Sequence, residues 1–174
     1  MKSLLLSLII LITNLSSHAQ QKKVNIIAGL NIGYPLQTIN TLRGKILSAG
    51  LDLNAHFNVS SQVSITSDIG YTTVFATDDA SPEIIPVRGG ICYYPSTKFF
   101  IGGKIGVGFV KNGGFTNAGF TSTLAYAFNT GFKISQHIEL GASYDAYTKD
   151  QPDQSGFKEN NTISIINLKL GYWF

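Results

Sequence analysis

The side chains best suited to catalysis are few and lie far apart in the sequence. After residue 19 the chain has two histidines, His56 and His137, and one cysteine, Cys92. A nucleophilic enzyme needs a serine or cysteine beside a base that a carboxylate orients, and neither histidine has such partners at a recognisable spacing. One cysteine makes no disulfide within the chain, and no group of His, Cys, Asp and Glu has metal-ligand spacing. We therefore expect no enzyme, no metal site and no cofactor.

Charged residues could guide ions or form salt bridges if the fold brings them close together. Four acidic and four basic residues each stand next to an apolar residue in stretches that carry little other charge: Asp52, Asp68, Arg88, Lys104, Lys133, Glu139, Asp145 and Lys169. Inside a narrow enclosure they could form the selectivity ring of an ion path. They could equally form a balanced set of salt bridges that fills the space. Which one applies depends on the elements that carry them.

Those elements are strands, because apolar residues alternate with polar or small residues in eight segments. The segments are 24–34, 47–59, 63–75, 85–93, 99–109, 120–134, 138–144 and 166–174. Hydrophobic residues make up 44% of the 174 residues and charged residues 13%, whereas soluble domains carry about 25% charged residues. This composition excludes a disordered chain, and a net charge of +3 is too small to indicate a nucleic-acid partner.

The connections between the segments alternate in length. Short turns are predicted at 60–62, 95–97 and 135–137, and longer polar loops at 37–45, 77–83, 111–118 and 149–161. Short turns at one end and long loops at the other are typical of a barrel that spans an outer membrane. The sequence therefore predicts an all-β fold, an eight-stranded antiparallel up-and-down transmembrane β-barrel.

A soluble barrel would also alternate, but its polar face would meet water and carry many lysines and glutamates. Here the polar face is mostly Gly, Ser, Thr and Asn, and about 11 of the 18 glycines lie on it. Small residues make room inside a narrow barrel, whereas glycine on a water-facing strand only weakens it. Aromatic residues also gather at both strand ends, as in the two girdles of a membrane barrel. We therefore expect the apolar face to contact lipid.

The predicted turns place the charged residues in the lumen. Asp52, Asp68, Arg88, Lys104 and Lys169 fall in one layer near mid-barrel, with Asp145 in a higher layer. Arg88 should lie directly opposite Lys104, so it needs Asp68 or Asp52 within ion-pair distance. Lys133 should lie opposite Glu139 and pair with it. With four charges of each sign, the sequence favours a salt-bridge plug over a conducting path.

The N-terminus has the features of a secretory signal peptide. Lys2 precedes the apolar run 4–12, and Ser17-His18-Ala19 is a small-x-small cleavage site. The run is about half the length of a membrane-spanning helix. We therefore expect a signal peptide at 1–19, a single barrel domain at 20–174, and a monomer in the outer membrane of a Gram-negative bacterium.

Two motifs carry a resemblance to a known family. The strand 85–94, with the sequence IPVRGGICYY, precedes a strand with alternating glycines, 99–109. This pair resembles the outer-membrane β-barrel domain family common in Bacteroidota, including PorT-like proteins. The end of the chain, Ile166, Leu168, Leu170, Tyr172 and Phe174, resembles the signal read by the barrel assembly machinery. The resemblance implies this machinery and outer-membrane lipid as partners.

Together these features favour a non-enzymatic barrel with a structural role, or one that binds an unidentified extracellular ligand through its outer loops. The longest predicted loop, 149–161, is the expected contact surface. A narrow channel for ions or small solutes is the alternative. A lipid-modifying enzyme is a third possibility, disfavoured because both histidines fall at the short-turn end.

Overall fold

A computed structural model describes residues 24–37, 45–76, 81–111, 119–152 and 158–174. They form eight strands: β1 (Val24–Gln37), β2 (Lys45–Asn58), β3 (Val63–Ala76), β4 (Glu83–Tyr93), β5 (Phe99–Lys111), β6 (Thr121–Lys133), β7 (Ile138–Pro152) and β8 (Lys158–Trp173). The predicted signal peptide at 1–19 lies outside the described residues. None of the described residues forms a helix long and apolar enough to cross a membrane.

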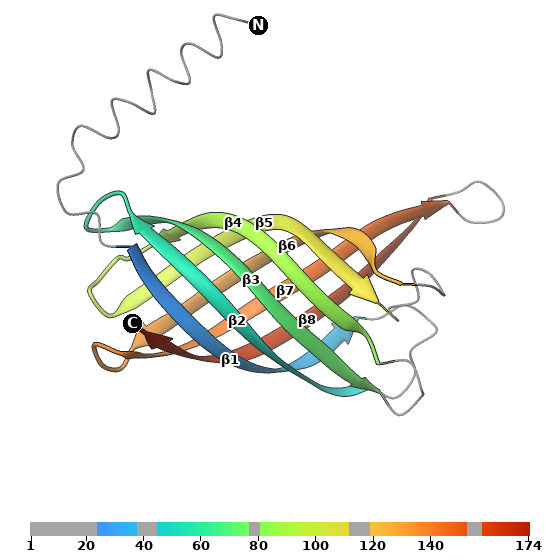
Figure 1. Cartoon of the computed structure of the whole chain (residues 1–174), viewed down its shortest axis with the longest axis horizontal. Helices are drawn as coiled ribbons and strands as arrows, with labels where there is room; N and C mark the ends of the chain where they lie inside the picture. The colour runs from blue at the N-terminus through green and yellow to red at the C-terminus, as the bar shows by residue number, and fades with distance from the viewer. Residues whose placement is uncertain (1–23, 38–44, 77–80, 112–118, 153–157) are drawn as a thin grey trace, which may run out of the picture.

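The strands close into a barrel in chain order. Each strand pairs antiparallel with its neighbours, and β1 pairs with β8 to complete the ring, as Figure 1 shows. The predicted fold class is confirmed. At 11 to 16 residues, every strand is long enough to cross a bilayer at a tilt, which takes about 9–11 residues.

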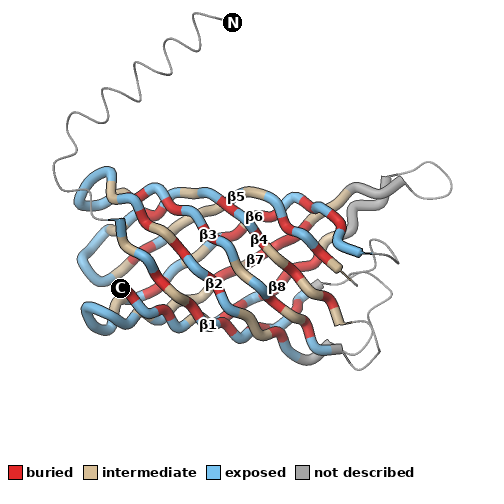
Figure 2. Tube along the Cα trace, viewed as in Figure 1, coloured by how far each residue is buried: buried red, intermediate tan, exposed pale blue. Residues whose placement is uncertain are grey.

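The apolar face of the sheet points outward along all eight strands. Figure 2 shows exposed and buried residues alternating along the trace. On β1, Leu30 and Ile32 are more than half exposed whereas Asn31 is 6% exposed. On β8, Leu168 is 64% exposed and Asn167 only 4%. A polar interior with an apolar exterior is the arrangement of a barrel in lipid.

Aromatic residues on the outer face lie near both ends of the barrel. At the end with the short turns, hereafter the short-turn end, they occupy or adjoin the strand termini: Phe57, Tyr93, Phe99, Phe132, Tyr172 and Phe174. At the opposite, long-loop end, Tyr34, Phe75, Phe109 and Phe120 lie within three residues of a strand terminus. Two such belts fit the two membrane interfaces.

All three short turns and the last loop differ from the prediction. The turns 59–62 and 134–137 each have four residues, one more than expected. The turn between β4 and β5 is Tyr94–Lys98 and not the three residues 95–97. The predicted loop 149–161 is wrong at both ends, because β7 continues to Pro152 and β8 begins at Lys158. Their ladder extends to the pair Pro152↔Lys158. Polar composition indicated a loop there, but backbone pairing between two adjacent strands does not require an apolar face.

Glycines on the inner face allow the strands to approach one another and the lumen contents. A Cβ atom at Gly131 would lie 2.5 Å from the Leu140 carbonyl oxygen and 2.6 Å from Phe100 Cζ. Outward-facing Gly103 differs, because a Cβ there would be 3.9 Å from the Phe128 ring, an ordinary contact. The inner positions therefore require glycine for space.

These two glycines give a matched test of the packing. Gly131→Ala should destabilise the barrel by about 1–3 kcal/mol, as over-packing does, because backbone atoms block the new methyl group. Gly103→Ala should have little effect. The measurement is the temperature at which the compact, heat-modifiable band is lost in detergent gels. Equal midpoints for the two variants would contradict the close packing at Gly131.

Candidate functional site in the barrel interior

The centre of the lumen is occupied by the guanidinium of Arg88 on β4. Its Nε and Nη2 donate to Oδ1 and Oδ2 of Asp68 on β3, at 3.1 and 2.7 Å, and its Nη1 donates to Asp145 on β7. The side chains of all three residues are at most 4% exposed. Arg88 therefore makes a two-point contact with its neighbour strand and a second ion pair across the lumen. The sequence predicted Asp68 or Asp52 as a partner of Arg88, and the partner is Asp68.

Two lysines extend the contacts around the lumen. Lys104 Nζ on β5 lies 3.2 Å from Asp68 Oδ2 and also donates to the Asn54 side chain on β2. Lys169 Nζ on β8 lies 3.2 Å from Asp52 Oδ2, and Asn54 donates to the other oxygen of Asp52. The layer predicted near mid-barrel thus forms one connected set of contacts.

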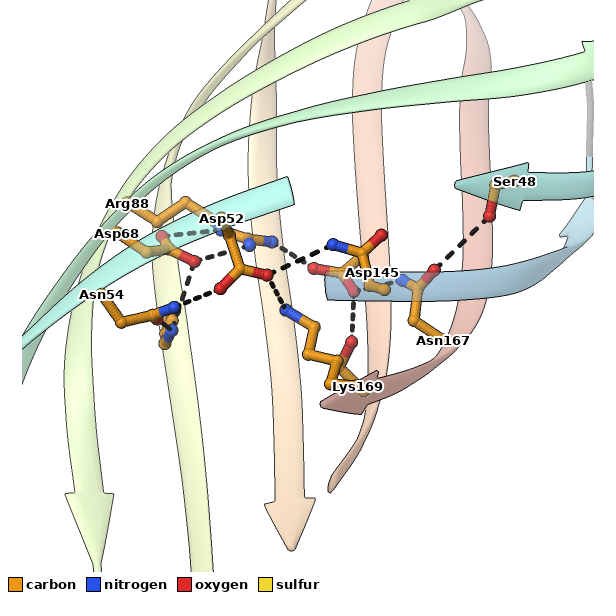
Figure 3. Close-up of polar contacts among 11 residues, drawn as sticks. Ser48, Asp52, Asn54, Asp68, Arg88, Asp145, Asn167 and Lys169 are labelled. Atoms are coloured by element: carbon orange, nitrogen blue, oxygen red, sulfur yellow. Dashed lines mark hydrogen bonds and ion pairs between the residues drawn. The ribbon is translucent and has the colours of Figure 1, made fainter. Parts of the chain in front are cut away.

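Polar side chains add contacts to this set and link it to β1. Asn167 donates to Asp145 at 2.7 Å and accepts from Ser48 at 3.4 Å, and Ser143 donates to Asp145 at 2.5 Å. Asn31 on β1 donates to Asp52 at 3.2 Å. Figure 3 shows these contacts converging from different strands. We call them the mid-barrel network: Asn31, Ser48, Asp52, Asn54, Asp68, Arg88, Lys104, Ser143, Asp145, Asn167 and Lys169.

The mid-barrel network is electrically balanced. It contains three carboxylates (Asp52, Asp68 and Asp145) and three cationic side chains (Arg88, Lys104 and Lys169). Buried charges of one sign would be costly, whereas paired and hydrogen-bonded charges are tolerated. Asp145, expected in a separate higher layer, is joined to the others through Arg88.

The predicted register between β4 and β5 is wrong by two residues. Arg88 lies opposite Gly106, and Lys104 lies opposite Gly90. The ladder begins at Tyr93↔Ile101, so Phe99 and Phe100 have no partner on β4, and this asymmetry shifts the pairing. The shift keeps two like charges from lying directly opposite each other, and both cations instead contact Asp68.

Lys133 and Glu139 are paired in register as predicted, but within the described part of the chain they form no ion pair. Both side chains instead contact Trp173 on β8. Its Nε1 donates to Glu139 Oε2 at 2.8 Å, and Lys133 Nζ lies 3.3 Å from its ring centroid. A cation over an indole face is a favourable contact, so the tryptophan replaces the predicted salt bridge.

A layer of rings fills the lumen at the short-turn end. The rings of His56 and Trp173 meet edge to face at 5.4 Å, and those of Tyr94 and Phe100 lie 6.2 Å apart. The Tyr94 hydroxyl is 2.8 Å from His56 Nδ1, and burial raises the pKa of Tyr94 above its ordinary value. We call these four residues the ring layer. His56 is thus held as a packed structural residue.

His137 and Cys92, the other residues considered for catalysis, also have packing or hydrogen-bonding roles. His137 Nδ1 lies 3.1 Å from the Trp173 carbonyl oxygen, and Cys92 is buried. Among the described residues, no three His, Cys, Asp or Glu side chains gather as metal ligands would.

The sequence analysis missed an apolar layer inside the lumen at the long-loop end. Seven side chains, each at most 2% exposed, pack together there: Val74, Ile84, Val110, Ala125, Tyr147, Ile163 and Ile165. Pairs of adjacent apolar residues near strand ends, such as Ile84-Ile85 and Val74-Phe75, were the available signal. In such a pair one side chain must point inward, because successive residues face opposite sides of a strand.

The C-terminal pattern lies on the outside of the barrel. Ile166, Leu168, Leu170 and Tyr172 are 45–64% exposed, and Phe174 is 74% exposed. All five are therefore positioned to contact lipid.

Comparison with known proteins settles the family. The model of the outer membrane protein beta-barrel domain matches residues 4–174. The chain belongs to this family. It is therefore a small outer-membrane β-barrel protein, with the fold that its residue pattern predicts. No curated protein is significantly similar to it in sequence.

Solved structures share the barrel at low sequence identity. The attachment invasion locus protein Ail of Yersinia pestis is 15% identical, over 88% of this chain and all of Ail, with a TM-score of 0.59. Neisserial surface protein A is 8% identical over 86% of this chain and 95% of its own, with a TM-score of 0.58. The outer membrane enzyme PagL is 18% identical over 83% and 97%, with a TM-score of 0.58. These similarities concern the fold.

Replacing Arg88 tests how far the lumen depends on it. Arg88→Met should destabilise the barrel by about 3–5 kcal/mol, because it leaves Asp145 without a cation and removes two bonds from Asp68. The control is Lys111→Met, since Lys111 and Glu83 lie 3.6 Å apart with side chains 40% and 30% exposed, a type of pair worth at most about 1 kcal/mol. Unfolding in urea, followed by tryptophan fluorescence in lipid vesicles, measures both. If Lys111→Met lowered the free energy of unfolding as much as Arg88→Met, the special role of Arg88 would be refuted.

Proposed function

We propose that this outer-membrane barrel is a non-enzymatic protein with a closed lumen, which acts structurally or by binding through its outer loops. The observation that carries the proposal is the filling of the lumen. The mid-barrel network joins seven of the eight strands with its charges paired. The apolar layer lies between this network and the long-loop end.

Both layers oppose the passage of ions. A conducting path needs a continuous column of water or exchangeable ligands, but the cavities beside the mid-barrel network are only about 30 and 10 Å³. An ion that passed would have to separate the Arg88 ion pairs and then enter the apolar layer without a polar partner. Each step carries a desolvation cost.

Binding at the surface is favoured by the shape of the β7–β8 hairpin. The last pair of β6 with β7 is Leu124↔Thr148, and the last pair of β1 with β8 is Gln37↔Ser164. The β7–β8 ladder continues beyond both, to Pro152↔Lys158. In Figure 1 this ribbon extends past the neighbouring strands at the long-loop end. We propose it, in place of a long irregular loop, as the support of the contact surface.

We further infer how the protein reaches the membrane. The pattern of residues 1–19 supports export by a cleaved signal peptide, and the outward-facing Phe174 supports assembly by the barrel assembly machinery. The IPV-containing strand followed by the glycine-alternating strand supports placement among the Bacteroidota, PorT-like members of the family. We propose a monomer in the membrane, because the closed ring leaves no unpaired sheet edge along the barrel.

Planar-bilayer recording separates a closed lumen from a narrow channel. The purified protein should give no steady unitary currents in symmetric salt, because the mid-barrel network and the apolar layer fill the lumen. Lys104→Ala is the companion variant, since its ammonium group lies in the centre of the lumen. Steady wild-type currents that Lys104→Ala abolishes would establish the channel in place of the closed barrel.

Mass spectrometry of lipid A tests for an enzyme. Spectra from cells with and without the protein should be identical, because His56 contacts Tyr94 and Trp173 and His137 contacts the Trp173 carbonyl, at the end of the barrel away from the outer leaflet. A mass change of lipid A that depends on the protein would overturn the non-enzymatic proposal, and His56→Ala would then locate the activity.

A further inference from the structure

The two ends of the lumen differ in how tightly they are packed. At the short-turn end an open depression of about 490 Å³ is lined by the turns 60–62 and 95–97 and by strand-end residues that include Asn25, Asn58, Ser64 and Lys133. On the other side of the network, the apolar layer has side chains no more than 2% exposed, and the cavity that borders Tyr147 is about 10 Å³.

A second, smaller cavity lies deeper, between the ring layer and the mid-barrel network. Its volume is about 30 Å³ and its lining includes His56, Asn129, Glu139, Lys104 and Lys169. A water molecule needs about 10–15 Å³ of such volume and two to four polar partners. The cavity therefore has room for about two water molecules.

The polar atoms around this cavity lack enough partners among the described residues. Asn129 Oδ1 is buried with no hydrogen-bond partner, although a buried acceptor costs free energy unless it is bonded. Lys169 lines the same cavity from β8, and its ammonium has three N–H groups but one described acceptor, Asp52. An acceptor without a donor and a donor with spare N–H groups therefore line the same water-sized cavity.

The ring layer stands between the two cavities. Each ring pair joins one residue of the mouth with one of the inner cavity: Trp173 with His56, and Tyr94 with Phe100. These are contacts between side chains and not backbone ladders, so rotamer motion can admit single water molecules. The corresponding step at the other end would pass through the apolar layer, in which the Tyr147 hydroxyl is the one polar side-chain group.

We propose that the lumen is a one-sided hydrated recess that opens to the periplasm. Water enters through the mouth at the short-turn end, and about two ordered molecules bridge Asn129 to Lys169 and Glu139 in the inner cavity. The recess ends at Arg88, beneath the apolar layer. This inference rests on the proposed closed lumen.

Magnetization transfer from water, measured by NMR on the barrel in lipid nanodiscs, tests the bound water. The Asn129 side-chain amide should show direct water cross-peaks, whereas the methyl groups of Ile163 and Ala125 should show none. Asn129→Leu removes the acceptor and fills the cavity, and it should abolish the water cross-peaks of the neighbouring His56 ring. Phe128→Leu, at an exposed outer position of the same strand, is the matched control and should leave them unchanged.

Thiol labelling tests the direction of entry. In a Cys92→Ala background, Asn58→Cys at the mouth should react fully with a water-soluble thiol reagent during a time in which Ile163→Cys does not react. The wild-type spectra decide the bound water even if Asn129→Leu fails to fold. The recess is ruled out if the Asn129 side-chain amide shows no water cross-peak, or if Asn58→Cys and Ile163→Cys are labelled equally. A conducting lumen would instead be detected as current in the bilayer experiment.

Discussion

The barrel depends on the burial of one guanidinium between two carboxylates. Arg88 donates to Asp68 on the adjacent strand and to Asp145 across the lumen, so it joins parts of the chain that no backbone ladder connects. Charge in a narrow lumen is tolerated only when it is paired and fully hydrogen-bonded. This requirement fixes the partners around Arg88, including Lys104 on Asp68 and Asn167 on Asp145. The rest of the interior is arranged around these pairs.

The membrane imposes the complementary constraint on the outside. Lipid offers no hydrogen bonds, so every backbone group must be paired within the sheet, and a closed ring of strands satisfies that condition. The apolar residues then have to face outward, which leaves polar and small residues to fill the lumen. Inner glycines such as Gly131 give bulky neighbours the space that a Cβ would occupy. The low charge and the high glycine content thus have one cause: apolar residues face outward and small or polar residues face the lumen.

The interior is divided into layers with different properties along its length. The ring layer and a polar mouth lie at the short-turn end, the mid-barrel network lies at the centre, and the apolar layer lies towards the long-loop end. This order makes the lumen asymmetric, although the ladder of strands around it is nearly uniform. A closed outer end and a polar inner end suit a protein whose outward contacts are made by its loops and hairpin. The proposed functions of surface and lumen are therefore separate.

The sequence by itself determined the strand number, the face of each strand and the need of Arg88 for an aspartate partner, with Asp68 and Asp52 both left open. These follow from a local pattern, because alternation with period two assigns every residue to the inside or the outside. Only the tertiary structure decided the register across Tyr94–Lys98, the position of Trp173 between Lys133 and Glu139, and the apolar layer. Each of these depends on turn geometry or on side chains that meet across the lumen. Such contacts join strands far apart in the chain, and no spacing along one strand records them.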